Sequence, residues 1–431
     1  MKARVVKILQ RSQPALVWLL TFLLPTQLGL HLWPSWSYVE GLRVDYLAPS
    51  LTLFDIVLVL TLLALWTTGT LTRPSSHRSI RAVLLIGMGI VVNVLFSSLP
   101  LLTLSRWIKI IMAGWVFVSM LNEKRYQKAV VLGLVSASCV QLALVLQQFF
   151  TQGAIQGGWY WLGERAIYPW MPDIAQLSIN GTQFMRPYGT FSHPNAMGGF
   201  FLCVHFFLWY TQHKSSPAGK LWSLLCILGT FTSSLLVCIS FSKAAIVTFT
   251  LIHILLVFRD PAYRWCKLCL VARPLMLIVV CLIFMQGQGD LYSVEKRWAL
   301  LSHAMQVIPP HLVTGTGLGA SVATMAGVYF QAIPLYQPVH QIGVLWLEEV
   351  GLVGVVVVIY LIRLYATRFD RSWGALAPLI AVVLTGLGDH YWLSQSQNIY
   401  LFILVIIWHL SLHDSQNDGK MTPWESSWTD A

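Results

Sequence analysis

The sequence predicts an all-α fold, that of a polytopic integral membrane protein with about twelve transmembrane helices and two long outer loops. Composition is the first reason: 56% of the 431 residues are hydrophobic and 10% are charged, whereas about 25% of the residues in a soluble domain are charged. The second reason is that apolar segments long enough to cross a hydrocarbon core of about 30 Å recur along the chain. The third is that basic residues collect beside alternate ends of these segments, as they do in cytoplasmic loops.

The apolar segments are expected to be helices, because a backbone in lipid must satisfy its own hydrogen bonds. Little of the chain remains outside them, so residues 1–431 are predicted to form a single transmembrane domain. The first segment has charged flanks and no small-residue cleavage site, so we expect a retained helix rather than a signal peptide. The predicted spans are 14–34, 51–71, 82–103, 107–122, 129–150, 196–212, 221–240, 243–258, 270–286, 341–361, 373–388 and 396–412.

The basic residues predict the orientation of these helices. Twenty of the 28 fall at the amino terminus, in alternate short connections or in the carboxyl-terminal tail. An excess of lysine and arginine marks the cytoplasmic side, so both termini are predicted to be cytoplasmic. The net charge of +11 then follows from topology and does not indicate nucleic-acid binding. The eight basic residues left for the outer side are Arg43, Arg106, Lys109, Arg165, Arg186, Lys243, Lys296 and Arg297.

Two connections, residues 151–195 and 287–340, are much longer than the others and are predicted to lie outside. Loops of this length are usually functional or disordered, and the many aromatic residues in both argue against disorder. Aromatic side chains suit a membrane interface, and they also suit stacking on sugars. Residues 291–308 are rich in Leu, Ala and Met, so we expect them to form a helix along the outer surface.

The first long loop ends in a segment suited to binding an anion. Pro194 fits the first turn of the next helix, and the N–H groups at a helix start favour a negative charge. Arg186, a few residues earlier, adds a planar fork of donors that matches a phosphate. The alternative is an arginine that reaches lipid headgroups. Lys243, in the very short outer turn 240–243, is likewise either an interface anchor or a phosphate contact.

The second long loop contains a charged stretch, residues 295–297, and then Gly315, Gly317 and Gly319. The charged residues could form an ordinary helix face. The G-x-G-x-G spacing follows no predicted strand and lies outside the cell, so it does not indicate a dinucleotide site. We expect these glycines to let the backbone turn sharply near a ligand.

Histidines stand where outer loops end. His340 closes the second long loop, and His390 lies in the last short outer turn. A single interfacial histidine is usually structural, but a histidine near arginine and lysine is a reasonable acid–base and anion-binding set. His340 is favoured as general base because the helix after it can hold it rigidly. The other two candidate bases are expected to have structural roles. His193 shapes the start of the next helix, and His390 pairs with Asp389.

Two of these segments resemble sequence blocks of the O-antigen ligase and O-antigen polymerase family of bacterial membrane glycosyltransferases. Arg-Pro-Tyr-Gly-Thr-Phe-Ser-His-Pro-Asn, residues 186–195, resembles the R-x-x-G-x-F-x-H-P-N block of that family. His340 and Gln341, followed after nine residues by Gly351, resemble its H-[NSQ]-x9-G block.

Three weaker blocks follow the same order along the chain. Residues 240–243 resemble the S-x-S-R turn of the family, with lysine in place of the arginine. Arg297 followed by residues 309–319 resembles its loop arginine and its P…G-x-G-x-G stretch. Residues 389–392, Asp-His-Tyr-Trp, resemble a late D-H-Y block found in some members. By motif the resemblance extends over roughly residues 180–395, and by topology over the whole chain.

The resemblance implies a glycosyltransferase of the bacterial inner membrane, whose donor is a glycan on a polyprenyl diphosphate and whose acceptor is a glycolipid, a glycan or a protein. It also implies inverting chemistry that needs neither metal nor cofactor. The residues agree, because there is no D-x-D pair to hold a divalent cation and the C-x-x-C pair at 266–269 lacks further ligands. Fixed cations must then stabilise the leaving diphosphate. We assign His340 and Arg297 to catalysis, Arg186, Lys243 and Arg297 to the diphosphate, and His193, Asn195, Gln341, Asp389 and His390 to support.

Other functions stay open. The sequence does not separate an O-antigen ligase from a polysaccharide polymerase or a protein O-oligosaccharyltransferase, because these activities share the same blocks. A secondary transporter or lipid-linked sugar flippase is an alternative of another class, in which acidic residues lie near the membrane midplane. Glu348 and Glu349, inside the predicted span 341–361, keep this alternative alive. They could instead be a pair that faces the interior of the helix bundle.

Overall fold

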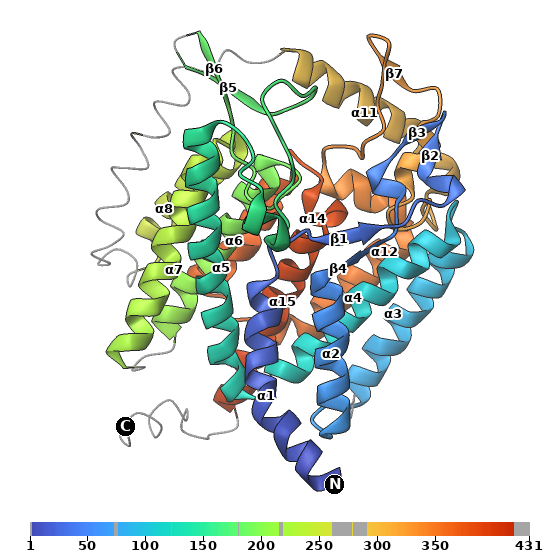
Figure 1. Cartoon of the computed structure of the whole chain (residues 1–431). Coiled ribbons are helices and arrows are strands. Elements are labelled where there is room, and N and C mark those ends of the chain that lie inside the picture. Colours follow the sequence, from blue (N-terminus) through green and yellow to red (C-terminus); the bar gives the residue numbers. More distant parts are fainter. Residues whose placement is uncertain are drawn as a thin grey trace.

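The computed structural model describes residues 2–72, 76–121, 123–179, 181–214, 219–260, 278 and 291–417. These residues are mostly helical (Figure 1), as the sequence predicts. Four helices are long and apolar enough to cross a membrane, and several shorter apolar helices accompany them. The chain is therefore a helical, membrane-associated protein. The four long helices are Pro100–Leu121, Arg125–Thr151, Lys220–Ile239 and Ile342–Arg368.

Helices overlap eleven of the twelve predicted spans, and the twelfth, residues 270–286, lies outside the described residues except for Ile278. That each of these helices crosses the membrane stays a prediction. An additional helix, α11, confirms the helix predicted at 291–308. Four of the helices have a serine or threonine N-cap whose side chain accepts an N–H from the first turn, which satisfies a donor that a helix start leaves free. The helices are α1 (Lys2–Phe22), α2 (Leu53–Thr67), α3 (His77–Leu95), α4 (Pro100–Leu121), α5 (Lys124–Thr151), α6 (Pro194–Lys214), α7 (Lys220–Ile239), α8 (Lys243–Arg259), α11 (Leu291–His311), α12 (Ile342–Tyr365), α13 (Trp373–Gly386), α14 (Tyr391–Ser394) and α15 (Ser396–Asn417).

Two predicted spans have wrong boundaries. The span 14–34 is too long at its carboxyl end, because α1 stops at Phe22 and the chain continues as four short strands and two short 3-10 turns up to residue 52. The span 82–103 crosses a break, because α3 ends at Leu95 and α4 begins at Pro100. Proline is favoured in the first turn of a helix, where its missing N–H costs nothing. Hydropathy does not detect either break because the residues around it are apolar.

The described residues also contain four two-stranded antiparallel sheets that an all-α prediction misses, three of them hairpins of consecutive strands. Figure 1 places β5, β6, β7 and α11 at the end of the molecule opposite the start of α1, which we call the loop end, and β1 and β4 nearer its middle. The two-residue turn between β2 and β3 has positive φ at Glu40 and Gly41, and the one between β7 and β8 has it at Gln331 and Ala332, as in a type I′ hairpin turn. The strands are β1 (Gly29–His31) with β4 (Ser50–Thr52), β2 (Tyr38–Val39) with β3 (Leu42–Arg43), β5 (Gln176–Ile179) with β6 (Thr182–Met185), and β7 (Tyr329–Phe330) with β8 (Ile333–Pro334).

The core is centred on α6, which packs against α7, α8, α13 and α15. Its Phe200, Phe201, Phe206 and Phe207 are all fully buried. A helix that is apolar on every side is a buried one, so the rest of the bundle holds α6 from all directions. The start of α6, at Pro194, is therefore a rigid point at the loop end.

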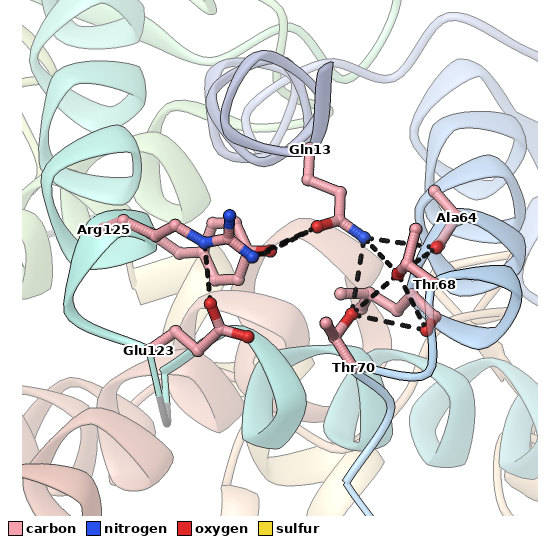
Figure 2. Close-up of polar contacts among 8 residues, drawn as sticks. Gln13, Ala64, Thr68, Thr70, Glu123 and Arg125 are labelled. Atoms are coloured by element: carbon pink, nitrogen blue, oxygen red, sulfur yellow. Dashed lines mark hydrogen bonds and ion pairs between the residues drawn. The ribbon is translucent and has the colours of Figure 1, made fainter. Parts of the chain in front are cut away.

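A polar network closes the other end of the bundle (Figure 2). The side-chain amide of buried Gln13 donates to Thr68, Thr70 and the Ala64 carbonyl. Its oxygen accepts from the Tyr126 hydroxyl and, at 3.4 Å, from Arg125. The network ties α1, α2 and α5 together. Each group has a partner, which a polar side chain buried between helices needs.

Candidate active site

A cavity of about 2060 Å³ opens at the loop end. It is larger than the 300–1,000 Å³ typical of small-ligand pockets, so it has room for part of a glycan or a lipid head. Its walls come from the first connection, both long loops, and the starts of α6 and α8. Of the eight basic residues that the sequence leaves for the outer side, all except Arg43 line it: Arg106, Lys109, Arg165, Arg186, Lys243, Lys296 and Arg297.

Arg186, Asn195 and Asp389 form a hydrogen-bonded chain in the wall of this cavity. Arg186 Nη2 donates to Asn195 Oδ1 at 2.8 Å, and Asn195 Nδ2 donates to Asp389 Oδ2 at 3.1 Å. Arg186 Nε and Nη2 also donate to the Ser240 carbonyl at 3.0 and 2.9 Å. The segment 186–195 thus reaches the 240–243 turn through Arg186 and the 389–392 segment through Asn195.

Most donors of Arg186 are used within the chain. Its Nε and Nη2 groups make the bonds above, while Nη1 keeps two donors for an anion in the cavity. Loss of water around the guanidinium lowers the pKa of Arg186 to about 10, so it stays charged at neutral pH. Arg186 can therefore support the Ser240 turn and bind an anion at the same time.

His340 pairs with Asp389. Its Nδ1 lies 3.4 Å from Asp389 Oδ1, and its Nε2 lies 3.2 Å from Gln337 Oε1. Burial raises the pKa of Asp389, but the contact with His340 and the nearby imidazoles of His390 and His193 outweigh burial and hold it well below its usual range. Asp389 is thus an anion that orients the imidazole of His340.

The other two histidines of the site are held differently. His193 Nδ1 accepts the backbone N–H of Asn195 at 3.1 Å, so it shapes the start of α6 as the sequence suggests. His390 contacts Ser394 Oγ through Nδ1 at 2.7 Å. The expected side-chain pair of His390 with Asp389 is replaced by the pair of His340 with Asp389. Burial, with nearby charges, lowers the pKa of His193 to about 4 and that of His390 to about 3.

The side chain of Gln341 caps a helix and does not line the cavity. Its side-chain oxygen accepts the Val344 N–H at 2.6 Å and caps the start of α12. This cap fixes the direction in which α12 leaves the loop. His340, the residue before the cap, is held at the cavity wall as a result.

Lys243 and Arg297 are the least constrained cations of the cavity. Both side chains are exposed, and neither forms a hydrogen bond or ion pair within the described part of the chain. Lys243 is the first residue of α8, directly after the Ser242 cap. Arg297 lies in α11, close enough for its charge to lower the pKa of His193 and His390. Two cations from different elements are thus available for an anion.

Two glycines in the second turn of α6 allow neighbouring segments to pack closely against it. A methyl group on Gly198 would lie 2.6 Å from Ser240 Oγ, and one on Gly199 would overlap the ring of Tyr391. Only glycine leaves this space. The 240–243 turn and the 389–392 segment can therefore both approach α6.

The G-x-G-x-G loop turns sharply, as predicted, and its glycines pack against other residues of the protein. Gly315, Gly317 and Gly319 all have positive φ. Their backbone packs on Glu349 and neighbouring side chains, and Gly319 N–H donates to Glu349 Oε2 at 2.8 Å. The sharp turn is therefore confirmed, and Leu318 within it lines the cavity. A bound ligand near these glycines stays a prediction.

The sequence analysis placed Arg106 and Lys109 on the outer side but assigned them no role in the site. Arg106 and Lys109 lie inside α4 rather than in a turn, and they face the cavity. Lys109 pairs with Asp55 at 2.7 Å. The first connection also contributes Trp33 and Tyr46. The available signal was two cations three residues apart within an apolar segment, because charges in such segments face an interior or a water-filled space.

The described residues include one group that could bind a metal ion: one donor atom each from His340, Asp389 and His390 lies within 4.8 Å of the others. The chain matches no protein-family profile, no curated protein and no solved structure. The chemistry of the site must therefore be argued from its own geometry. It combines an oriented imidazole, a large cavity and an excess of cations over acids.

Proposed function

We propose that this protein is a membrane glycosyltransferase that moves a glycan from a polyprenyl diphosphate to an acceptor hydroxyl at the outer face of a bacterial inner membrane. The observation that carries the proposal is the convergence of seven basic residues and the His340–Asp389 pair on one cavity. A diphosphate is the ligand that needs many cations, and a hydroxyl nucleophile is the reactant that needs a base.

In the proposed reaction, the acceptor oxygen attacks the anomeric carbon as the bond from that carbon to the diphosphate oxygen breaks. The hydroxyl proton passes to His340, and Asp389 stabilises the imidazolium that forms. The negative charge moves to the polyprenyl diphosphate, where Arg186, Lys243 and Arg297 offset it. A single displacement of this kind inverts the anomeric centre and requires no metal.

The position of His340 favours it as the base. Burial and nearby charges lower the pKa of His193 to about 4 and that of His390 to about 3, and a general base is most effective when its pKa is near the working pH. The Nδ1 atom of His340 lies 3.4 Å from the carboxylate of Asp389. The other nitrogen, beside Gln337, is the one that can receive the proton.

A transporter is the candidate of another class, and the contacts of one of the two buried acids, Glu349, argue against it. The carboxylate of Glu349 accepts the Gly319 N–H and the Ser321 hydroxyl, both at 2.8 Å. A carboxylate held in this way supports a loop and is not available to carry a substrate ion. Ligase, polymerase and protein O-oligosaccharyltransferase activities remain alternatives within the proposed class, since they differ in the acceptor.

The test is a transfer assay with the purified full-length chain, a labelled polyprenyl-diphosphate glycan, and glycolipid, glycan and protein acceptors. We expect transfer to one acceptor class, with full activity in EDTA. His340→Ala should bind the donor but transfer it at least about a hundredfold more slowly, as loss of a general base costs about 10²–10⁴-fold. Near-normal transfer by His340→Ala, with His193→Ala or His390→Ala inactive, would overturn the assignment of the base. Activity that EDTA abolishes and Mg²⁺ restores would contradict the mechanism.

A further inference from the structure

The contact between His340 and Asp389 leaves one ring nitrogen of His340 without a hydrogen bond, which points to a bound cation. His340 Nδ1 is buried and makes no hydrogen bond, and its 3.4 Å separation from Asp389 Oδ1 exceeds the usual 2.7–3.2 Å range for such a bond. When the proton of the ring is on Nε2, where Gln337 Oε1 can accept it, Nδ1 and Oδ1 face each other as two acceptors. A cation between them removes this repulsion.

His390 supplies the third donor. Its ring centroid lies 4.6 Å from that of His340, at an interplanar angle of 71°. Its Nδ1 is engaged by Ser394 Oγ, so Nε2 is the nitrogen left for a ligand. The three donor atoms, within 4.8 Å of one another, need to close to roughly 3.3 Å for tetrahedral zinc. Rotation of two imidazole rings and one carboxylate can provide this shift.

Each of the three residues is also held by a hydrogen bond with a neighbouring side chain, as metal-binding residues usually are. Gln337 holds His340 Nε2, Ser394 holds His390 Nδ1, and Asn195 Nδ2 holds Asp389 Oδ2. Metal-binding histidines usually have their second nitrogen hydrogen-bonded in this way. The site opens to the cavity, so water can fill the fourth position.

We propose that His340, Asp389 and His390 form a binding site for Zn²⁺, and that the bound Zn²⁺ inhibits the protein. Two imidazole nitrogens and one carboxylate select zinc over Mg²⁺, which prefers oxygen ligands. Zinc takes the lone pair of His340 Nδ1 and leaves the ring proton on Nε2. The nitrogen that would receive the acceptor proton is then already protonated, so transfer stops without any change in donor binding. This inhibition rests on the proposed function, whereas the binding of zinc does not.

Binding is tested directly by titrating Zn²⁺ into the tag-free, full-length chain in isothermal calorimetry. A Cys266→Ser, Cys269→Ser background removes the C-x-x-C pair as a competing ligand set. We expect one Zn²⁺ per chain, weakened at least tenfold by Asp389→Asn and by His390→Ala. Ser394→Ala keeps all three donors and should weaken binding roughly tenfold, through the orientation of His390. His303→Ala, a histidine of α11 bonded to Thr324 outside the cavity, is the matched control and should bind as the background does.

Zinc binding that is absent, or that the Asp389, His390 and Ser394 variants leave unchanged, would overturn the site. The Ser394 variant keeps the test decisive if the other two fail to fold. For inhibition, Zn²⁺ should slow glycan transfer by the unsubstituted chain, EDTA should restore it, and Mg²⁺ should have no effect. Stoichiometric binding at these residues without slower transfer would refute the inhibition and leave the site standing. Absence of any transfer would refute the proposed function alone, because the calorimetry needs no activity.

Discussion

At the scale of single residues, position 243 is where the chain departs from the S-x-S-R turn that it resembles. A lysine offers one compact charge, whereas an arginine offers a planar fork that binds phosphate through two bonds. Here the turn is already supported by Arg186, whose guanidinium holds the Ser240 carbonyl. A second guanidinium is therefore less necessary, and a point charge at the first residue of α8 suits the proposed diphosphate.

Lys243→Arg is expected to keep transfer activity, and Lys243→Ala to lose most of it. A charge-assisted hydrogen bond contributes about 1.5–3 kcal/mol, which corresponds to a rate loss of roughly 10–150-fold. The matched control is Lys220→Ala, because Lys220 is also exposed and also begins a helix, α7, but it does not line the cavity. Initial transfer rates with saturating donor measure the effect. Full activity of Lys243→Ala would mean that this lysine only anchors α8 at the interface.

At the scale of elements, α12 is two helices joined at Gly351, where φ is 69° and ψ is −171°. The break leaves backbone N–H and carbonyl groups without partners inside the helix, and the segment 312–317 forms hydrogen bonds with them. Leu312 and Val313 carbonyls accept from Leu352 and Val353, while Thr316 and Gly317 donate to the Glu348 and Glu349 carbonyls. Irregular backbone within a membrane bundle is tolerated only where protein supplies such partners.

Gly351→Ala should therefore lower the stability of the protein. The backbone conformation at this position is open essentially to glycine alone, and a strained residue costs about 1–3 kcal/mol. The added methyl group would also lie 2.5 Å from the Val313 carbonyl oxygen. Gly87→Ala in α3 is the matched control, because nothing lies within 4 Å of its new methyl group and alanine favours a helix. Thermal unfolding in detergent should show a lower midpoint for Gly351→Ala only. Equal midpoints would mean that the break is not held by the loop.

At the scale of the whole molecule, the basic residues divide between two ends. Seven that the sequence places outside line the cavity, while Arg125 belongs to the network at the opposite end (Figure 2). A protein inserted with its lysine- and arginine-rich connections in the cytoplasm would hold the cavity outside. This placement suits a donor delivered at the outer leaflet.

Labelling of single cysteines in intact cells tests this orientation. A membrane-impermeant maleimide should react with Tyr160→Cys and Trp298→Cys, whose side chains are exposed at the loop end. It should not react with Ser76→Cys, an exposed position between α2 and α3, until the membrane is permeabilised. The unsubstituted chain controls for the native cysteines. Labelling of position 76 alone would reverse the topology, and the proposed donor could then not reach the site from the outer leaflet.

Composition and hydropathy determined the helical, membrane-associated character of this protein. Each helix can be predicted from its own apolar segment, without knowledge of its tertiary contacts. The sequence also located the histidines and most of the cations that line the cavity. Only the tertiary structure decided that Asn195 links Arg186 to Asp389, and that Asp389 pairs with His340 rather than with His390. These contacts join segments separated by many residues, and they depend on how closely the helices pack. The paired strands were missed for a different reason, because each has only two to four residues, too few for a period of two to show.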